Sequence, residues 1–336
     1  MILRFVLGRA LGLLVVLWVL VTIVFMLGAV IPSEPARAYA GAGASPEVIA
    51  QKREELGLDK PLLTRYVDYL ERLGRGDLSE SVHTHQPVAD DLREAFPATL
   101  ELLLASIGIT MLIGLAVGVV TARPRRGTGL LRGLLVAGAS VPVFTLGLLA
   151  LFFFYYKLGW FPAGGQTSPR TIHVVGPTGF LSIDCLRTGH YGVFLNDLWH
   201  LVLPATALAL TPALLTARTL RSSLRHSLRQ DYARTARAKG LTERQVLWRH
   251  ALRNSINAPL TICGLELGAM LAGIAVVETI FAWPGIGLYI DRSIAANDVP
   301  AICGVTLVIG IVFVVANAIV DALQMVVDPR LRQLSA

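Results

Sequence analysis

The stretch Arg218–Asn257 reads RTLRSSLRHSLRQDYARTARAKGLTERQVLWRHALRNSIN and lies between two long apolar runs. It contains ten cations but only two carboxylates, Asp231 and Glu243. Loops on the cytoplasmic side of a membrane carry an excess of Lys and Arg. We therefore expect this loop, 218–257, to face the cytoplasm. Its cations are Arg218, Arg221, Arg225, Arg229, Arg234, Arg237, Lys239, Arg244, Arg249 and Arg253.

Within this loop the residues predict two helices joined by a tight corner. The run from Asp231 to Lys239 contains good helix formers, and Gly240 supplies the left-handed position that ends a helix. Thr242 is a typical N-cap, and Gln245 three residues later completes a capping box. The pattern indicates a rigid helix–corner–helix, suited to a groove on a soluble partner.

The composition is that of a membrane protein. Of 336 residues, 54% are hydrophobic and 16% are charged, and the mean hydropathy is +0.61. The net charge of +7 is concentrated in the loop 218–257, so it indicates topology and not nucleic-acid binding. A DNA-binding helix-turn-helix is disfavoured, because a loop tethered at both ends to membrane spans can hardly enter a major groove.

Hydropathy predicts an all-α polytopic protein with six transmembrane helices. The first span, within 1–31, follows Arg4 and Arg9; a cleaved signal peptide ending near Ala38–Ala40 is the alternative, although the apolar run is long for one. Pro142 is expected to bend the third span. The other spans are placed at 98–120, 131–156, 199–217, 259–282 and 301–325 within a permease core of 98–325.

Residues 32–97 are expected to form a small extracytoplasmic domain between the first two spans. This segment is acidic and contains two amphipathic patterns. One pattern begins at Ser45–Pro46 and ends near Gly57, and the other runs from Pro61 to Gly74. We expect these helices to lie on the membrane surface.

The charge distribution predicts which ends are cytoplasmic. Summed over the expected loops, eighteen Lys and Arg lie inside and twelve outside, so the amino terminus and the tail 326–336 are both expected inside. Trp160, Phe161 and Trp199 are candidate anchors at the outer interface.

Several phrases give the chain a specific resemblance. YARTARAKGL followed by RHALRN resembles the EAA loop of permease subunits of binding-protein-dependent ABC importers, in the dipeptide, oligopeptide and nickel branch. LGLDKPLLTRY, GDLSES, VETIFAWPGIG and ANAIVDALQMVVDPRLR are also similar to this family, and to its first-permease type. The chain departs from the general pattern at Arg234–Ala236, where Glu-Ala-Ala is usual, and at His250–Arg253, where Ile-x-Leu-Pro is usual.

The resemblance implies a type I importer permease fold and a set of partners: a second homologous permease, one or two ABC ATPase subunits, an extracytoplasmic substrate-binding protein and the lipid bilayer of a bacterial inner membrane. It implies no cofactor on this chain, with ATP and Mg²⁺ bound by the ATPase, and no nucleic-acid partner. It also implies that the helix before Gly240 is the coupling helix. The residues implied in ATPase coupling are Asp231, Tyr232, Arg234, Thr235, Ala236, Arg237, Ala238, Lys239 and Gly240.

The chain itself encodes no energy source, since it contains no Gly-x-x-x-x-Gly-Lys-Ser/Thr phosphate loop. Ionisable residues within spans are candidates for function, and Glu266 with Met270 is the expected substrate-path pair. A secondary transporter driven by an ion gradient, with Glu266 and Asp321 as proton carriers, remains the alternative. An intramembrane enzyme is disfavoured because no paired catalytic constellation is present, so no catalytic residue is predicted.

No metal site is expected. His83 and His85 form a pair without a third ligand, which is a weak signal. A disulfide between Cys185 and Cys303 is left open, with unpaired cysteines favoured. The cargo also stays open among dipeptides, oligopeptides, glutathione, nickel chelates and haem.

Overall fold

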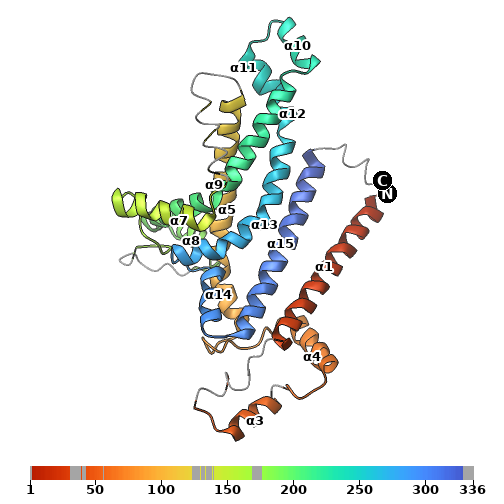
Figure 1. Cartoon of the computed structure of the whole chain (residues 1–336), viewed down its shortest axis with the longest axis vertical. Coiled ribbons are helices and arrows are strands. Elements are labelled where there is room, and N and C mark those ends of the chain that lie inside the picture. Colours follow the sequence, from red (N-terminus) through yellow and green to blue (C-terminus); the bar gives the residue numbers. More distant parts are fainter. Residues whose placement is uncertain are drawn as a thin grey trace. The chain divides into compact units, whose positions relative to one another are not determined.

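The computed structural model describes residues 2–30, 43–55, 57–122, 140–168 and 176–327, with the isolated residues Tyr39, Gly129, Gly133 and Gly138. The side chains of residues 1–10, 30, 321 and 323–327 also lie outside the described set. The regular secondary structure of the described part is helical, with one isolated bridge between Glu80 and Pro87, so the all-α expectation is confirmed there (Figure 1). Its elements are α1 (Ile2–Val30), α3 (Pro46–Glu55), α4 (Leu62–Gly74), α5 (Val88–Ala122), α7 (Val143–Ala150), the π-helix η1 (Leu151–Lys157), α8 (Leu181–Thr188), α9 (Tyr191–Ser227), α10 (Asp231–Ala238), α11 (Glu243–Gln245), the π-helix η2 (Val246–Ala251), α12 (Leu252–Ser255), α13 (Asn257–Ile280), α14 (Ile286–Ala295) and α15 (Val299–Val327).

Five of the described helices are long and apolar enough to cross a membrane. They are Leu11–Ala29, Val88–Ala122, Tyr191–Ser227, Asn257–Ile280 and Val299–Val320. A shorter apolar helix, Val143–Lys157, occupies part of the expected third span, whose residues 131–139 lie outside the described set except for Gly133 and Gly138. The polytopic membrane fold is thus confirmed, with five candidate spans in the described residues.

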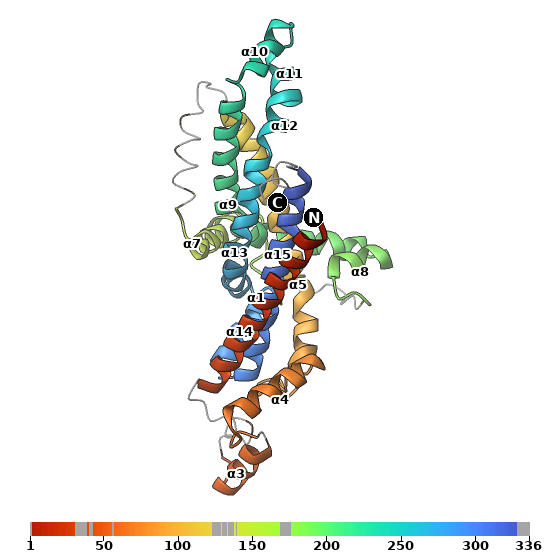
Figure 2. The same ribbon diagram turned by 90° about the vertical axis from the view of Figure 1, so that its right-hand side faces the viewer.

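The chain divides into two compact units. The first comprises Met1–Thr99 and Pro284–Val314, and its core packs Val88 and Leu92 of α5 against Ile286, Ala301 and Val305. The second comprises Leu100–Trp283 and Val315–Ala336. In the second unit α9, α12 and α13 run side by side, as both Figures 1 and 2 show.

Two long helices extend beyond the membrane spans predicted within them. α5 begins at Val88, ten residues before the predicted span, and Val88 and Leu92 are buried on one face of its polar first turns. α9 begins at Tyr191 and continues to Ser227, so Arg218, Arg221 and Arg225 at the start of the segment 218–257 lie on this helix. Pro97 lies inside α5, and Pro204 and Pro212 lie inside α9.

Pro142 is the N-cap residue of α7, and the expected bend of the third span at this proline stays a prediction, since most of residues 130–139 lie outside the described set. The φ of −60° and ψ of 145° at Pro142 place it in extended backbone immediately before α7, a conformation that proline adopts without strain. The two helices predicted in the outer segment are confirmed as α3 and α4, with Gly57 at φ 62° after the first and Pro61 as the N-cap of the second.

Candidate functional site

The basic stretch folds into a compact elbow, defined here as α10, the corner at 239–242 and α11. α10 turns Ala233 and Ala236 inward, and both are buried against Val246 of η2. Leu228 and Leu241 pack against the same cluster. The small alanine side chains let α10 lie close to η2, so the elbow has an apolar interior of its own.

The corner after α10 is a complete Schellman motif. Gly240 has φ 81°, its N–H donates to the Arg237 carbonyl at 2.9 Å, and the Leu241 N–H donates to the Ala236 carbonyl at 3.2 Å. These are the two hydrogen bonds that close a helix when the residue after the C-cap is left-handed. The predicted glycine corner is therefore present.

The next helix begins with the predicted capping box. The Gln245 N–H donates to Thr242 Oγ1 at 3.3 Å, and the Thr242 N–H donates to Gln245 Oε1 at 2.8 Å. Two backbone donors that would otherwise lack partners are satisfied by this exchange. The direction of the chain leaving the corner is thereby fixed.

Arg237 holds the elbow together from within. Its Nε lies 2.6 Å from Glu243 Oε1, and its Nη1 donates to the Leu228 carbonyl at 3.1 Å. One guanidinium thus joins the end of α9, α10 and the start of α11. Because the planar guanidinium can serve several acceptors at once, a lysine could not make the same set of contacts.

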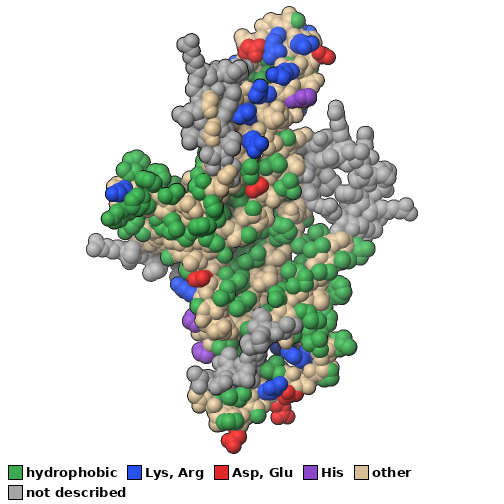
Figure 3. Space-filling model, in the orientation of Figure 1, with side chains coloured by type: hydrophobic (Ala, Val, Ile, Leu, Met, Phe, Trp, Pro, Cys, Tyr) green, Lys and Arg blue, Asp and Glu red, His purple; other side chains and the backbone are tan. Residues whose placement is uncertain are grey.

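The remaining predicted coupling residues lie on the outer face of α10 and its corner. Asp231 is 96% exposed, and it pairs with Arg234 at 3.5 Å within the helix. Figure 3 shows Lys and Arg side chains gathered over α10–α12. The elbow presents a polar, largely cationic surface. The exposed predicted residues are Asp231, Tyr232, Arg234, Thr235, Ala238, Lys239 and Gly240.

The base of the elbow is continuous with the long helices. Leu220 and Leu224 of α9 are buried against Leu247 and Ala251 of η2. Beside them the Ser227 and Ser255 hydroxyls form a buried hydrogen bond of 2.8 Å. Packed side chains therefore connect α10 through η2 to α9.

The two expected substrate-path residues occupy different environments. Met270 is 1% exposed and packs in the interior, which weighs against a place on an open pathway. Glu266 is partly exposed on α13, and within the part of the chain that the structure describes no hydrogen bond or ion pair satisfies its carboxylate. A carboxylate in that position faces lipid, water or another chain. A role for Glu266 on the substrate path therefore stays a prediction.

The sequence prediction missed a buried polar network at the other end of α9. Glu101 accepts hydrogen bonds from Gln166 Nε2 at 2.9 Å and from the Ser182 N–H at 3.0 Å. Ser182 Oγ donates to Asp197 Oδ2 at 2.6 Å, and Asp197 Oδ1 is buried without a partner. The network fastens the segment before α9 onto α5 and α9. The sequence feature that could have predicted this network is the presence of two carboxylates, Glu101 and Asp197, within apolar stretches.

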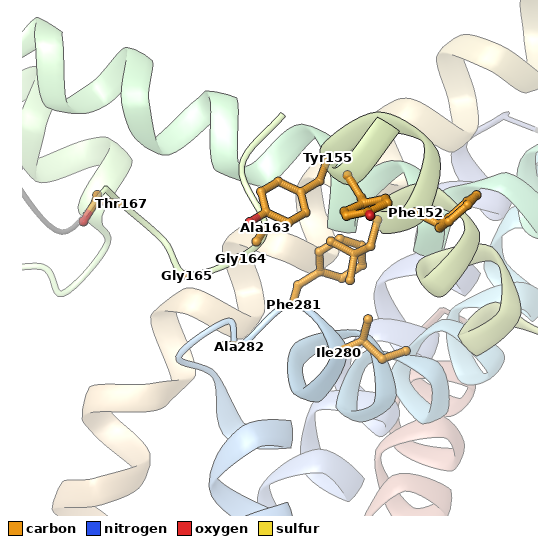
Figure 4. A pocket seen from close by; sticks show the side chains of 11 residues that line it. Phe152, Tyr155, Ala163, Gly164, Gly165, Thr167, Ile280, Phe281 and Ala282 are labelled. Atoms are coloured by element: carbon orange, nitrogen blue, oxygen red, sulfur yellow. The ribbon is translucent and has the colours of Figure 1, made fainter. Parts of the chain in front are cut away.

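The same segment passes close to the end of α13, beside an apolar pocket of about 730 Å³. The Gly165 N–H donates to the Phe281 carbonyl at 2.8 Å, and a Cβ on Gly164 would lie 2.1 Å from that oxygen. Figure 4 shows Phe152, Tyr155 and Phe281 among the side chains that line this pocket. The Trp199 ring stacks on the Phe161 ring, with 4.5 Å between their centroids.

The remaining residues considered from the sequence concern a metal site, a disulfide and a proton carrier. No group of three or more His, Cys, Asp and Glu suited to a metal occurs among the described residues. Cys185, Cys263 and Cys303 are free thiols, so the disulfide left open above is not formed. The side chain of Asp321, like the positions Ala38 and Ala40, lies outside the described residues.

Comparison with known families covers nearly the whole chain. Residues 111–333 match the family described as the inner membrane component of binding-protein-dependent transport systems. Residues 2–103 match the family describing the N-terminal region of such membrane components.

Full-length relatives bear related names. The chain is 39% identical over 325 residues to the probable D,D-dipeptide transport system permease protein DdpB of Escherichia coli (strain K12), covering 96% of each chain. It is 39% identical over 331 residues to the di/tripeptide transport system permease protein DppB of Pseudomonas aeruginosa, covering 97% of this chain and 98% of the relative. A dipeptide transport system permease protein of Alkalihalophilus pseudofirmus is 36% identical over 332 residues, covering 98% and 99%.

Proposed function

Because the chain belongs to the family of inner membrane components of binding-protein-dependent transport systems, we propose that it is one permease subunit of an ATP-driven ABC importer. It forms half of a translocation pathway with a second, homologous permease. A substrate-binding protein delivers the cargo, and one or two ABC ATPase subunits supply the energy. The observation that carries the proposal is the elbow, a projection held together by the hydrogen bonds of Arg237 and packed against η2 and against Leu228 at the end of α9.

The chain performs no covalent chemistry in this proposal. ATP and Mg²⁺ bind to the ATPase subunits, since this sequence contains no phosphate loop. Movement of the ATPase displaces the outer face of α10, and the elbow passes the displacement into α9 and α13. The pathway then alternates between outward and inward access. A transporter driven by an ion gradient is not favoured, because the family depends on a binding protein and Glu266 has no proton-relay partner in the described residues.

The proposed cargo is a dipeptide, a tripeptide or a related small solute. The relatives that support this choice are named for D,D-dipeptides, di/tripeptides and dipeptides. In the membrane, we place six spans with both termini in the cytoplasm, Val143–Lys157 belonging to the third. Residues 32–97 then lie on the extracytoplasmic side, where the binding protein docks.

Copurification tests the proposal. It also distinguishes the role of the exposed outer face of α10 from that of the internal contacts of Arg237. The permease pair and its ATPase subunits are expressed together, and the ATPase retained per permease is measured along with uptake per ATP hydrolysed. We expect the wild type to retain the ATPase, and a Tyr232→Ala, Lys239→Glu variant on the outer face to lose it.

The same assay tests the internal contacts of Arg237 with Glu243 and with the Leu228 carbonyl. Arg237→Lys keeps the charge and the outer face, so the ATPase should stay bound while uptake per ATP falls. Arg249→Lys is the matched control, because Arg249 is exposed on η2, outside the elbow and outside the predicted coupling residues. An assembled wild-type transporter without any ATPase bound at the elbow would overturn the proposal.

A further inference from the structure

The helix α4 has a strongly two-sided sequence, LLTRYVDYLERLG. At the helical period of 3.6 residues, one side carries Leu63, Tyr66, Val67 and Leu70, while Arg65, Asp68 and Arg72 fall on the opposite side. In a soluble domain the apolar side of such a helix is packed against a core.

In this structure a large part of that apolar side is uncovered. Leu63 is 79% exposed and Val67 is 59% exposed. Neither faces the cavity of about 610 Å³ beside α4, which is lined instead by residues of the polar side such as Arg65, Asp68 and Arg72. The exposed leucine and valine therefore need an apolar surrounding that this unit does not provide.

Contacts with α1 fix the depth at which α4 lies. Tyr66 Oη is 2.7 Å from Thr22 Oγ1, and the Phe25 ring lies 5.1 Å from the Tyr66 ring and 5.5 Å from the Tyr69 ring. The apolar window of α1 continues to Ala29. At 1.5 Å per residue, Thr22 and Phe25 lie about 10 Å and about 6 Å inside the end of that window.

From this depth we propose that α4 lies in the membrane interface, with Leu63 and Val67 inserted among the lipid acyl chains beside α1. Interfacial helices bury their apolar side about 5–10 Å into the boundary between headgroups and acyl chains, which agrees with the contacts to Thr22 and Phe25. The lipid surface is thus the partner of this side of α4, and the proposal requires only that α1 spans the bilayer.

The polar side of α4 is consistent with exposure to water and headgroups. Lys60 Nζ lies 2.8 Å from Asp68 Oδ2, and Arg75 Nη2 lies 2.5 Å from Glu71 Oε1. Arg72 also donates to Ser79 Oγ at 3.4 Å. Asp68 and Arg72 lie on the side away from Leu63 and Val67, and the charge of Glu71, at the edge of the apolar side, is paired with Arg75, so insertion of the apolar side leaves no charge unpaired in hydrocarbon.

Quenching of site-specific fluorophores in the complete, vesicle-embedded transporter tests the proposal. Single cysteines at Leu63 and Val67 on the apolar side and at Arg65 and Asp68 on the polar side, in a background lacking the three native cysteines, are labelled with bimane. Phosphatidylcholine brominated near the headgroup end of its chains is expected to quench the labels at 63 and 67 several-fold more than those at 65 and 68. Aqueous iodide should show the reverse order.

Two outcomes would overturn the idea. Equal quenching by iodide at all four positions would place α4 in water. Protection of 63 and 67 from both quenchers would show that a protein surface, such as the second permease or a docked binding protein, covers this side. A second readout uses no label: the thermal unfolding temperature in vesicles should fall for Leu63→Asp with Val67→Asp and stay near the wild-type value for Thr64→Asp. None of these readouts depends on transport activity.

Discussion

At the scale of single residues, Gly240 shows how a small feature sets the direction of the chain. Its φ of 81° is unfavourable for residues with a Cβ, yet a Cβ there would meet no atom within 4 Å. Space is therefore not the constraint at this position. The requirement for glycine comes from the backbone conformation that the Schellman corner demands.

Gly240→Ala is accordingly expected to destabilise the corner by about 1–2 kcal/mol, the cost of left-handed backbone for a residue with a Cβ. Gly240→Asn should be milder, because asparagine tolerates this region better. Hydrogen–deuterium exchange of the α10 amides in the purified transporter measures the change as faster local opening. Gly192→Ala is the control, since Gly192 is helical and equally open; the same exchange in both variants would contradict the argument.

At the scale of elements, α8 and the segment before it depend on hydrogen bonds more than on apolar burial. Ser182, at the second position of α8, uses its N–H for Glu101 and its hydroxyl for Asp197. Asp197 is 0% exposed, and its second oxygen already has no partner. The Ser182 hydroxyl donates a short hydrogen bond of 2.6 Å to the other oxygen, so it is a main partner of this buried carboxylate.

Ser182→Ala removes that donor and keeps the backbone bond to Glu101. We expect a loss of about 1–3 kcal/mol in the free energy of unfolding, because a buried acceptor is left without its hydrogen bond. Thermal unfolding in detergent measures the loss, and proteolysis should reach residues 158–190 more readily. Thr206→Ala is the matched control, since its hydroxyl only caps a carbonyl of the same helix; equal stability of the two variants would refute the role given to Ser182.

At the scale of the molecule, α9 separates the polar network from the elbow. Asp197 and Ser227 stand thirty residues apart on one helix, which corresponds to about 45 Å along a straight axis. The hydrocarbon core of a bilayer is about 30 Å thick. A helix of this length can therefore place α8 and the elbow on opposite sides of the membrane.

The expected orientation puts α8 outside and the elbow in the cytoplasm. A cysteine at Arg187 should react with a membrane-impermeant maleimide on intact cells, whereas a cysteine at Lys239 should react only after permeabilisation. The unaltered chain, whose Cys185 and Cys263 are buried, measures the background. Reaction at Lys239 on intact cells would place the elbow outside and remove the proposed contact with an ATPase.

The elbow and the membrane character were predictable from the sequence. The Gly240 corner depends on residues within six positions of one another, as does the capping box of Thr242 and Gln245, so their short-range rules needed no knowledge of the rest of the chain. The apolar runs likewise predicted the five helices that are long enough to span a membrane, because a bilayer demands about twenty apolar residues whatever packs around them.

Only the tertiary structure decided what depends on distant partners. It buried Leu220 and Leu224 and so continued α9 past the first arginines of the loop, and it brought Gln166 to Glu101 across 65 residues of chain. It also gave Arg237 the Leu228 carbonyl as a partner and enclosed Met270. Burial and long-range hydrogen bonds are properties of the packed helices, so the local order of residues that fixed the elbow could not specify them.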